Sequence, residues 1–406
     1  MKNLEFIEKL LDGVGVEWKR LGDLVRIKNG KDHKALGEGE FPVYGSGGIM
    51  RYADTYAYNK PSVLIPRKGS LGNLFFVDVP FWTVDTIFYT EIDEAQIRPK
   101  YFYYFLTTVG LGEMNQAGGV PSQTQSVLNE LKIPIPCPDN PKKSLEIQAE
   151  IVRILDAFTA MTAELTAELN LRRQQYNYYR DQLLSFEEGE VEWKTLGEIG
   201  RIVTGRTPKS SDKSAWGDEV DFVTPSDIKN GMRNVTSPSR RLSALGAAAM
   251  LRTWVPSGSL LVSCIGADMG KTVINANDCI PNQQINAIIL TDCSVQNGYL
   301  FHVLTSMREK LRRQGESGAG TMPIINKSDF SKIVVPIPSE EQQARIVAIL
   351  DKFDALTNSI TEGLPREIEL RQKQYEYYRD LLFSFPKPEA GWSELRPTFY
   401  DHHGHS

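Results

Sequence analysis

The amino-acid sequence predicts a mixed α/β protein with two similar globular domains, separated by two long antiparallel coiled-coil helices and related by a pseudo-twofold internal repeat. Three observations predict this fold class: a narrow apolar seam at heptad spacing, a second copy of that seam later in the chain, and a tryptophan motif that opens each half. A seam this narrow and long packs against one partner helix rather than covering a globular core. Because the second seam lies in the same chain, we expect the two helices to pair.

The first seam begins at Ile151 and ends at Phe186, and its spacing alternates strictly between four and three residues. Its members are Ile151, Leu155, Phe158, Thr162, Leu165, Leu169, Arg172, Tyr176, Tyr179, Leu183 and Phe186. The surrounding chain is rich in Ala, Glu, Leu, Gln and Arg, and it contains Thr-Ala-Glu-Leu twice in tandem at 162–169. Propensity and period therefore both predict a long helix.

The second seam repeats the first over residues 346–385. The segment Ile-Val-x-Ile-Leu-Asp-x-Phe at 151–158 returns at 346–353, an offset of 195, and Gln-Tyr-x-Tyr-Tyr-Arg-Asp at 175–181 returns at 374–380, an offset of 199. The four extra residues form a stutter, which unwinds a coiled coil locally without losing its apolar face. Gly363 and Pro365 fall in that turn. A helix interior disfavours both residues, so a kink or a brief break is expected there.

Each half follows one plan of tryptophan motif, variable segment and long helix. Val-Glu-Trp-Lys-x-Leu-Gly opens the first half at residue 16 and the second at residue 191. We expect a first globular domain at 1–144, a spacer helix at 145–187, a second globular domain at 188–338, a second spacer helix at 339–386, and a C-terminal tail at 387–406 that is predicted to be disordered.

The variable segments read as short strands followed by a helix and a Gly-rich loop. In the first half, after a short amphipathic helix at 6–11, strands are predicted at 41–44, 62–67, 74–79 and 85–92, a helix at 100–108 and a loop at 118–119. In the second half, strands are predicted at 221–228, 259–265, 271–276 and 284–292, a helix at 297–314 and a loop at 318–320. Both segments end in Pro-Ile-Pro, at 134–136 and 336–338, and lead directly into the long helix.

The composition is that of a globular protein with more than one domain. The chain has 406 residues, of which 41% are hydrophobic and 24% are charged. It contains no apolar run of about 18 residues, and its first residues do not form a signal peptide, so a cytoplasmic location is expected. The cysteines show neither a C-x-x-C pair nor a histidine at metal spacing, which predicts reduced, buried thiols and no metal site. They are Cys137, Cys264, Cys279 and Cys293.

The net charge of −5 is unevenly distributed along the chain. Residues 145–192 and 339–406 carry net charges of −6 and −4, whereas residues 1–144 are neutral and residues 193–338 hold 17 basic and 12 acidic side chains. Surface potential is local. A basic cleft on the second variable segment is therefore compatible with an acidic total, and nucleic acid remains a possible partner.

One segment imitates a nucleotide-binding loop, Gly-Ala-Asp-Met-Gly-Lys-Thr at 266–272. A P-loop needs four residues between its outer glycines and opens a helix, but here there are three and a strand follows. A tight turn is expected instead, as at 69–72 in the first half. No other catalytic motif is found, and the histidines His402, His403 and His405 belong to the predicted disordered tail rather than to a metal site.

Basic and amide side chains in the variable loops are the candidate binding residues. Arg suits guanine, Gln suits adenine, and Lys or Arg binds phosphates. For any one of them an ordinary solvated surface residue is the simpler interpretation, and it is the set, present in both repeats, that favours DNA. The candidates are Lys31, His33, Lys34, Arg67, Lys68, Gln123 and Gln125 in the first half, and Arg206, Lys209, Arg240, Arg241, Lys271, Gln283, Gln284, Arg312 and Arg313 in the second.

The tryptophan motifs, the Pro-Ile-Pro exits and the repeated helix segments together resemble the specificity subunit of a type I restriction-modification enzyme. The Thr-Ala-Glu-Leu tandem resembles the IC subfamily in particular. The resemblance covers nearly the whole chain and is most specific in the helices. The tail from Gly391 matches no part of the pattern.

The resemblance implies a non-catalytic DNA reader in which each domain is a target recognition domain for one half of a bipartite, asymmetric double-stranded sequence. It implies two modification subunits, which use S-adenosylmethionine to methylate adenine, and restriction subunits that use ATP and Mg²⁺. This chain itself would bind no cofactor.

Two other classes of function stay open at this stage. A coiled-coil scaffold could carry two protein-binding domains, and it would lack the steep salt dependence that phosphate neutralisation gives to DNA binding. An NTPase would bind nucleotide at 266–272.

Overall fold

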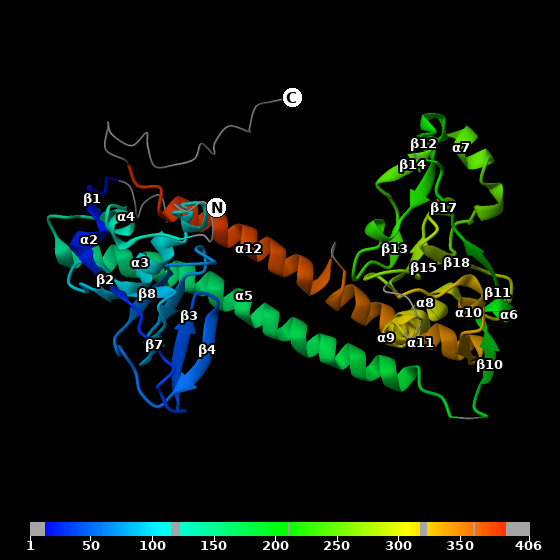
Figure 1. Ribbon diagram of the computed structural model, residues 1–406, viewed down its shortest axis with the longest axis horizontal. Helices are drawn as coiled ribbons and strands as arrows, with labels where there is room; N and C mark the ends of the chain where they lie inside the picture. Colours follow the sequence, from blue (N-terminus) through cyan, green and yellow to red (C-terminus); the bar gives the residue numbers. More distant parts are fainter. Residues whose placement is uncertain are drawn as a thin grey trace. The chain divides into compact units, whose positions relative to one another are not determined.

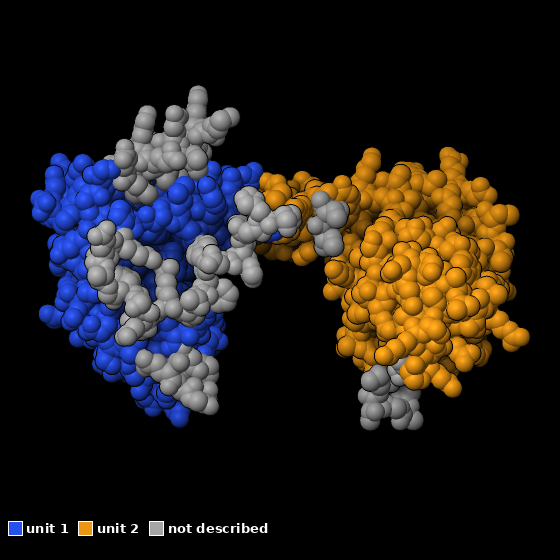
Figure 2. Space-filling view, turned by 90° about the horizontal axis from the view of Figure 1, so that it is seen from above, with its two compact units in different colours: residues 1–162, 371–406 blue, residues 163–370 orange. Residues whose placement is uncertain are grey.

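The computed structural model describes residues 13–114, 122–187, 189–209, 211–316, 323–359 and 362–386. The predicted helix at 6–11, the glycine loops at 118–119 and 318–320, and the C-terminal tail lie outside the described residues. The chain divides into two compact units (Figure 2): unit 1 comprises Met1–Thr162 and Arg371–Ser406, and unit 2 comprises Ala163–Leu370. Among the described residues, no helix is long and apolar enough to cross a membrane.

Besides a two-stranded ribbon, unit 1 contains two small sheets in its described residues. Its four-stranded sheet is antiparallel throughout, in the order β2 (Val25–Asn29), β8 (Ile87–Ile92), β5 (Ser62–Pro66) and β6 (Phe75–Val77). A three-stranded sheet follows the order β4 (Gly48–Ala53), β3 (Phe41–Gly45) and β7 (Trp82–Thr83). Helix α3 (Pro99–Leu106) buries Tyr101 and Phe102 in the core with β5, whose residues are all buried. The four predicted strands and the helix are confirmed, with bounds that differ by one to three residues.

Unit 2 repeats this plan. Its larger sheet has the order β11 (Gly200–Thr204), β18 (Ile285–Leu290), β15 (Leu260–Ser263), β16 (Thr272–Asn275) and β13 (Asn234–Val235). The smaller sheet has the order β14 (Arg240–Leu242), β12 (Trp216–Val223) and β17 (Cys279–Pro281), and Figure 1 shows it beside α7 (Ala244–Ala248) in one lobe of the unit. The predicted strand at 221–228 is wrong in its second part, because the chain turns after Val223 into a short 3-10 helix, Pro225–Asp227.

The single helix predicted at 297–314 is also wrong, because the structure divides it at Met307 into α8 (Asn297–Ser306) and α9 (Arg308–Glu316). Helix α8 buries six of its ten residues, whereas α9 buries only Leu311 and Gly315 of its nine. The apolar pattern thus changes where the chain turns. Helical propensity alone does not reveal such a turn.

The tryptophan motif and the Pro-Ile-Pro exit of each half are the two strands of one ribbon. In unit 1, β1 (Val16–Arg20) pairs antiparallel with β9 (Lys132–Pro136), and Trp18 lies opposite Pro134. In unit 2, β10 (Glu192–Thr195) pairs with β19 (Val334–Ile337) in the same way. Two-stranded ribbons tolerate proline because one side of each strand needs no ladder hydrogen bond.

Two long helical segments follow these ribbons. Helix α5 (Pro141–Leu183) is continuous over 43 residues, while the second segment consists of α11 (Glu340–Thr357) and α12 (Gly363–Leu382). The predicted interruption is therefore confirmed. Gly363 has φ +74°, and a Cβ there would lie 2.3 Å from the backbone oxygen of Ala355, so only glycine fits. Pro365 falls in the first turn of α12, where the missing N–H has no cost.

The seam residues make the expected contacts within each unit. In unit 1, Phe158 of α5 stacks on Tyr378 of α12, with ring centroids 5.2 Å apart. In unit 2, Tyr179 of α5 stacks on Phe353 of α11 at 5.6 Å. Buried seam residues include Ile151, Leu155, Leu169 and Tyr176.

Candidate nucleic-acid interface

Each unit brings three strand ends to one edge of its larger sheet, which we call the loop edge. In unit 1, β2 and β5 both run antiparallel to β8, so they end at the edge where β8 begins, near Asn29, Pro66 and Ile87. In unit 2, β11 and β15 end where β18 begins, with Thr204 opposite Asn286 and Ser263 opposite Ile285. The loops that carry most of the predicted binding residues meet at these edges.

At each loop edge, a glycine allows its backbone to lie very close to a neighbouring backbone segment. A Cβ on Gly30, just after β2, would lie 1.9 Å from the backbone oxygen of Val84. A Cβ on Gly205, just after β11, would lie 2.1 Å from that of Pro281. Since real Cβ atoms do not come this close, both loops depend on glycine. Sequence reasoning missed this pair, although the two glycines are 175 residues apart, the same offset as the tryptophan motifs.

The loop edge of unit 1 presents exposed Lys31, Lys34 and Lys68, with half-buried His33 beside them. The backbone N–H groups of Lys31 and Lys68 donate to the oxygens of Thr83 and Thr86, which fixes both loops to the segment that joins β7 to β8. Gln125 Nε2 donates to Asn29 Oδ1 at 3.2 Å, at the start of α4 (Gln125–Asn129).

Gln123 and Arg67 form part of the wall of this edge. Gln123 is only 2% exposed, and its amide donates to Pro66 O at 2.5 Å. Its backbone N–H donates to Arg67 O, and the half-buried guanidinium of Arg67 lies 5.9 Å from the centre of the Phe88 ring. In this conformation Gln123 is not the solvent-facing amide that we expected, because its side chain joins the loop to β5.

The loop edge of unit 2 presents exposed Arg206, Lys209 and Gln283, and half-buried Gln284. Arg206 N–H donates to Pro281 O, and Thr207 Oγ1 donates to Gln283 Oε1. Gln284 Oε1 accepts a hydrogen bond from the Asn282 amide at 3.1 Å. Two amide side chains and two cations thus share one surface.

Arg240 and Arg241 do not belong to the loop edge, since they lie on β14 in the smaller sheet. Arg240 stacks on Trp216, with its Cζ 3.3 Å from the ring centre. Arg241 Nε donates to Asp221 at 2.9 Å, and that carboxylate is buried. Arg241 therefore compensates a buried charge, which is a structural role.

The turn at 266–272 joins β15 to β16, so the predicted tight turn is confirmed and no helix follows it. Gly266 and Gly270 both have φ near +80°, and Lys271 Nζ contacts Asp268 Oδ1 at 2.7 Å. The remaining candidates, Arg312 and Arg313, are exposed on α9, where Arg312 pairs with Glu316 at 3.1 Å.

The cysteines differ in exposure. Cys264 and Cys279 are buried, and burial raises the pKa of each thiol to about 12, so neither is a nucleophile at neutral pH. Cys293 is exposed, which corrects the prediction that all four are buried. In the described part of the chain, no three His, Cys, Asp or Glu side chains are grouped as metal ligands.

An aspartate joins each domain to its long helix, and sequence reasoning missed this pair of joints. Asp156 of α5 accepts a hydrogen bond from Tyr104 O–H at 2.6 Å. Asp351 of α11 contacts His302 Nε2 at 2.7 Å and the guanidinium of Arg233. The repeated Ile-Leu-Asp segment of the two helices was the available signal.

A buried glutamine makes a second joint. Gln148 Oε1 accepts a hydrogen bond from Arg98 N–H at 2.8 Å, and Gln343 Oε1 accepts one from Gln296 N–H at 2.9 Å. Both glutamines are fully buried, and both use Nε2 to donate to backbone oxygens. In both halves, equivalent hydrogen bonds thus attach the globular domain to its long helix.

The two domains share one arrangement of strands and helices, but the side chains on their equivalent loops differ. Together these features define a protein with two recognition domains that are related by an internal repeat. The family model described as type I restriction modification DNA specificity domain matches residues 13–172 and again residues 188–370. The chain belongs to this family.

Individual relatives agree with the family model. The type I restriction enzyme EcoR124I/EcoR124II specificity subunit of Escherichia coli is 41% identical over 96% of this chain and 99% of its own length. The EcoprrI specificity subunit of Escherichia coli is 32% identical over 89% of this chain and 93% of its own length. The crystal structure of the type I S subunit from M. genitalium shares the fold, with a TM-score of 0.61 at 16% identity, over 93% of this chain and 98% of that one.

Proposed function

We propose that this chain is the DNA specificity subunit of a type I restriction-modification complex, in which each domain reads one half of a bipartite, asymmetric target. The observation that carries this proposal is the comparison of the two loop edges. The strands and the close-approach glycines are equivalent, but the exposed side chains differ: lysines dominate in unit 1, and Arg206 with two glutamines in unit 2. The same backbone arrangement with two different sets of side chains suits the recognition of two different half-sites.

The exposed side chains at both edges have the chemistry of duplex readers. Arginine and glutamine form bidentate contacts with guanine and adenine edges in the major groove, and lysines bind backbone phosphates. We assign base reading first to Gln125, Arg206, Gln283 and Gln284, and phosphate binding to Lys31, Lys34, Lys68 and Lys209. Arg206, Gln283 and the four lysines are exposed, whereas Gln125 and Gln284 are half-buried at the same edges.

We further propose that the chemistry belongs to partner subunits in the cytoplasm. Two modification subunits would supply adenine methylation with S-adenosylmethionine, and restriction subunits would use ATP and Mg²⁺. The long helices offer docking surfaces, because Tyr178 and Tyr377 are 62% and 57% exposed at equivalent positions. Exposed aromatic rings of this kind mark interaction sites. The neighbouring Tyr378 contributes less to such a surface, because its ring stacks on Phe158.

The test is to map methylated adenines in cells that carry this chain and its modification subunit. Gln283→Ala should relax one half-site and leave the other unchanged, and Gln125→Ala should do the reverse. Lys310→Gln, which removes an exposed charge on α9 outside the loop edge, is the matched control and should change neither. Methylation without a bipartite motif would contradict the proposal. The scaffold alternative predicts binding that is insensitive to salt, whereas a DNA reader weakens steeply as salt rises.

A further inference from the structure

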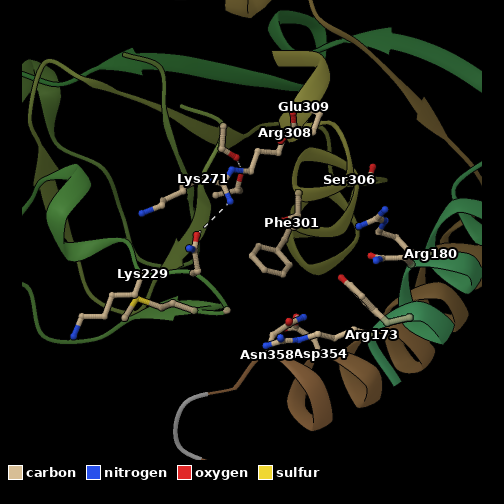
Figure 3. Close-up of a pocket in the computed structure, with 18 residues that line it drawn as sticks. Arg173, Arg180, Lys229, Lys271, Phe301, Ser306, Arg308, Glu309, Asp354 and Asn358 are labelled. Atoms are coloured by element: carbon tan, nitrogen blue, oxygen red, sulfur yellow. Dashed lines mark hydrogen bonds between the residues drawn. The ribbon is translucent and has the colours of Figure 1, made fainter. Parts of the chain in front are cut away.

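Unit 2 contains a cavity of about 390 Å³ that the recognition of DNA bases does not explain. Its walls come from α5, the loop after the 3-10 helix Pro225–Asp227, the start of β16, the junction of α8 with α9, and the end of α11. Figure 3 shows Phe301 in the centre, with Arg173 and Arg180 on the α5 side and Lys229 and Lys271 on the opposite side. All of these residues belong to unit 2.

The lining carries an excess of positive charge. Five cations line the cavity, Arg173, Arg180, Lys229, Lys271 and Arg308, against two carboxylates, Glu309 and Asp354. Burial raises the pKa of the Asp354 carboxyl group.

Only two of the five cations are neutralised by carboxylates nearby. Arg180 pairs with Asp181 at 2.8 Å and Lys271 with Asp268 at 2.7 Å. Arg308 donates to the neutral amide oxygen of Asn230 at 3.2 Å, the dashed line in Figure 3. Arg173 and Lys229 form no ion pair with any described residue. A concave site with unpaired cations attracts anions.

A second observation points independently to a ligand. Thr305 lines the cavity, and its hydroxyl oxygen is buried without a hydrogen-bond partner among the described residues. Buried hydroxyls are normally paired, so an unpaired one beside a cavity marks a position where a bound group can supply the partner. The aromatic rings of Phe301 and Tyr176 complete the lining, and the combination of rings, amides and arginines is typical of sites for organic phosphates.

The internal repeat shows that the shared helical scaffold does not need Arg173. Arg173 corresponds to Gln372 in the second helical segment, and Asn177 corresponds to Glu376. By contrast, Tyr176 and Arg180 return unchanged as Tyr375 and Arg379. The conserved pair therefore belongs to the architecture of both halves, whereas the extra positive charge is particular to the second half.

We propose that this cavity binds a phosphate or diphosphate group, carried either by a free nucleotide or by a nucleic-acid backbone. Arg173 and Arg308 would hold the phosphate oxygens, and Thr305 would donate to one of them. The site differs from a P-loop, because Gly270 and Lys271 enter it from a strand-to-strand turn. It does not depend on the DNA reading proposed above.

Titration of the full chain, in complex with its modification subunit, with inorganic pyrophosphate tests the proposal by calorimetry. We expect one site per chain, and Arg173→Gln or Arg308→Gln should weaken it by about tenfold or more, which corresponds to one charge-assisted hydrogen bond. Arg173→Gln copies the residue at the equivalent position of the second helical segment, so folding should be preserved. Lys310→Gln on α9, outside the cavity, should bind like the wild type. Absence of binding at millimolar pyrophosphate, or equal binding by all variants, would overturn the proposal.

Two further measurements distinguish the sources of the phosphate. If the ligand is a free nucleotide, ADP should compete with pyrophosphate, and Arg173→Gln should leave the salt dependence of duplex binding unchanged. If the ligand is a backbone phosphate, ADP should compete poorly, and the same variant should reduce the salt slope of duplex binding by about one. Both outcomes support a phosphate site.

Discussion

His302 and Tyr104 make equivalent contacts with the long helices, but only the histidine can titrate in the ordinary pH range. Each lies three residues after a buried tyrosine, Tyr299 or Tyr101, that donates to a proline oxygen of the neighbouring ribbon. Burial, with a smaller effect from the charge of Arg233, lowers the pKa of His302 from 6.5 to about 3. These two effects outweigh the attraction of Asp351, so His302 is neutral and donates from Nε2.

This depressed pKa predicts acid sensitivity. In the unfolded chain the imidazole takes up a proton near pH 6.5, whereas in the folded chain it resists until about pH 3. The unfolded state therefore binds more protons, and stability is lost as the pH falls through this window. His302→Tyr, which copies Tyr104, should retain the bond to Asp351 and show a smaller loss of Tm between about pH 7 and 4.5. An identical pH dependence in both proteins would show that His302 is not the titrating group.

The close-approach glycines give a second prediction at this scale. Gly205→Ala places a methyl group against Pro281 O and should destabilise the chain by about 1–3 kcal/mol, while displacing the loop that carries Arg206. Methylation mapping should then show that only the half-site read by unit 2 is weakened. Gly15→Ala is the control, because nothing lies within 4 Å of its Cβ position. Intact recognition in Gly205→Ala would mean that the loop does not read bases.

Single residues were the least predictable part of the site. Composition and position singled out loops that meet at the loop edges, but they did not distinguish Gln123, which is buried against Pro66 O, from Gln125, which lies at the edge. Arg241 was equally ambiguous, since its role depends on the buried carboxylate of Asp221. Such assignments require three-dimensional partners that are far away in sequence.

At the scale of elements, the regular spacing of apolar residues was the reliable signal for the helices. The heptad seam predicted α5 and the interruption before Gly363 because both follow from local spacing. The strands β1 and β10 were missed, because each is stabilised by a partner more than a hundred residues away. The same reason explains the two-residue strands β7 and β13, which have no pattern of their own.

The continuous helix α5 predicts how the target spacing can be changed. One more Thr-Ala-Glu-Leu unit after Leu169 adds four residues, about 6 Å of helix, with a rotation of about 40° relative to whole turns. Because four residues form a stutter, the seam from Arg172 onwards should still pair. We expect the unread gap between half-sites to lengthen by one base pair, with both half-sites unchanged in a methylation map.

A two-residue insertion at the same place is the matched control. It turns the following seam by about 200°, away from its partner, and should abolish methylation or destabilise the chain. An unchanged gap in the four-residue variant would mean that α5 does not set the spacing.

At the scale of the whole molecule, the duplication predicts exchangeable domains. The contacts between the first variable segment and the rest of unit 1 include the ribbon, the aspartate and glutamine joints, and the packing of Phe383 on Tyr101 and Phe105. Residues 22–133 can therefore be replaced by the matching segment of a relative that keeps these contacts. A chimera that retains Asp156, Gln148 and the ribbon pairing should fold, and in a methylation map one half-site should change while the other stays. Changes in both half-sites would show that the two recognition surfaces are coupled.

The internal repeat also explains how much of the architecture could be predicted from the sequence. Recurrence of the tryptophan motif, the exit and the helix segments predicted two similar domains without any knowledge of their strands. It did not predict that unit 1 combines two segments from distant parts of the chain. That arrangement follows from contacts such as the hydrogen bond from Trp18 Nε1 to Pro386 O at 2.8 Å.

The core of unit 1 includes Leu382, Phe383 and Phe385, which are all buried there. Residues 163–370, in contrast, supply the whole of unit 2. During synthesis unit 1 therefore cannot complete its core until residues 371–386 have left the ribosome. Unit 2 can fold earlier, because all of its residues have been made by residue 370. A premature stop after residue 370 would spare unit 2 and leave the first domain with an open core.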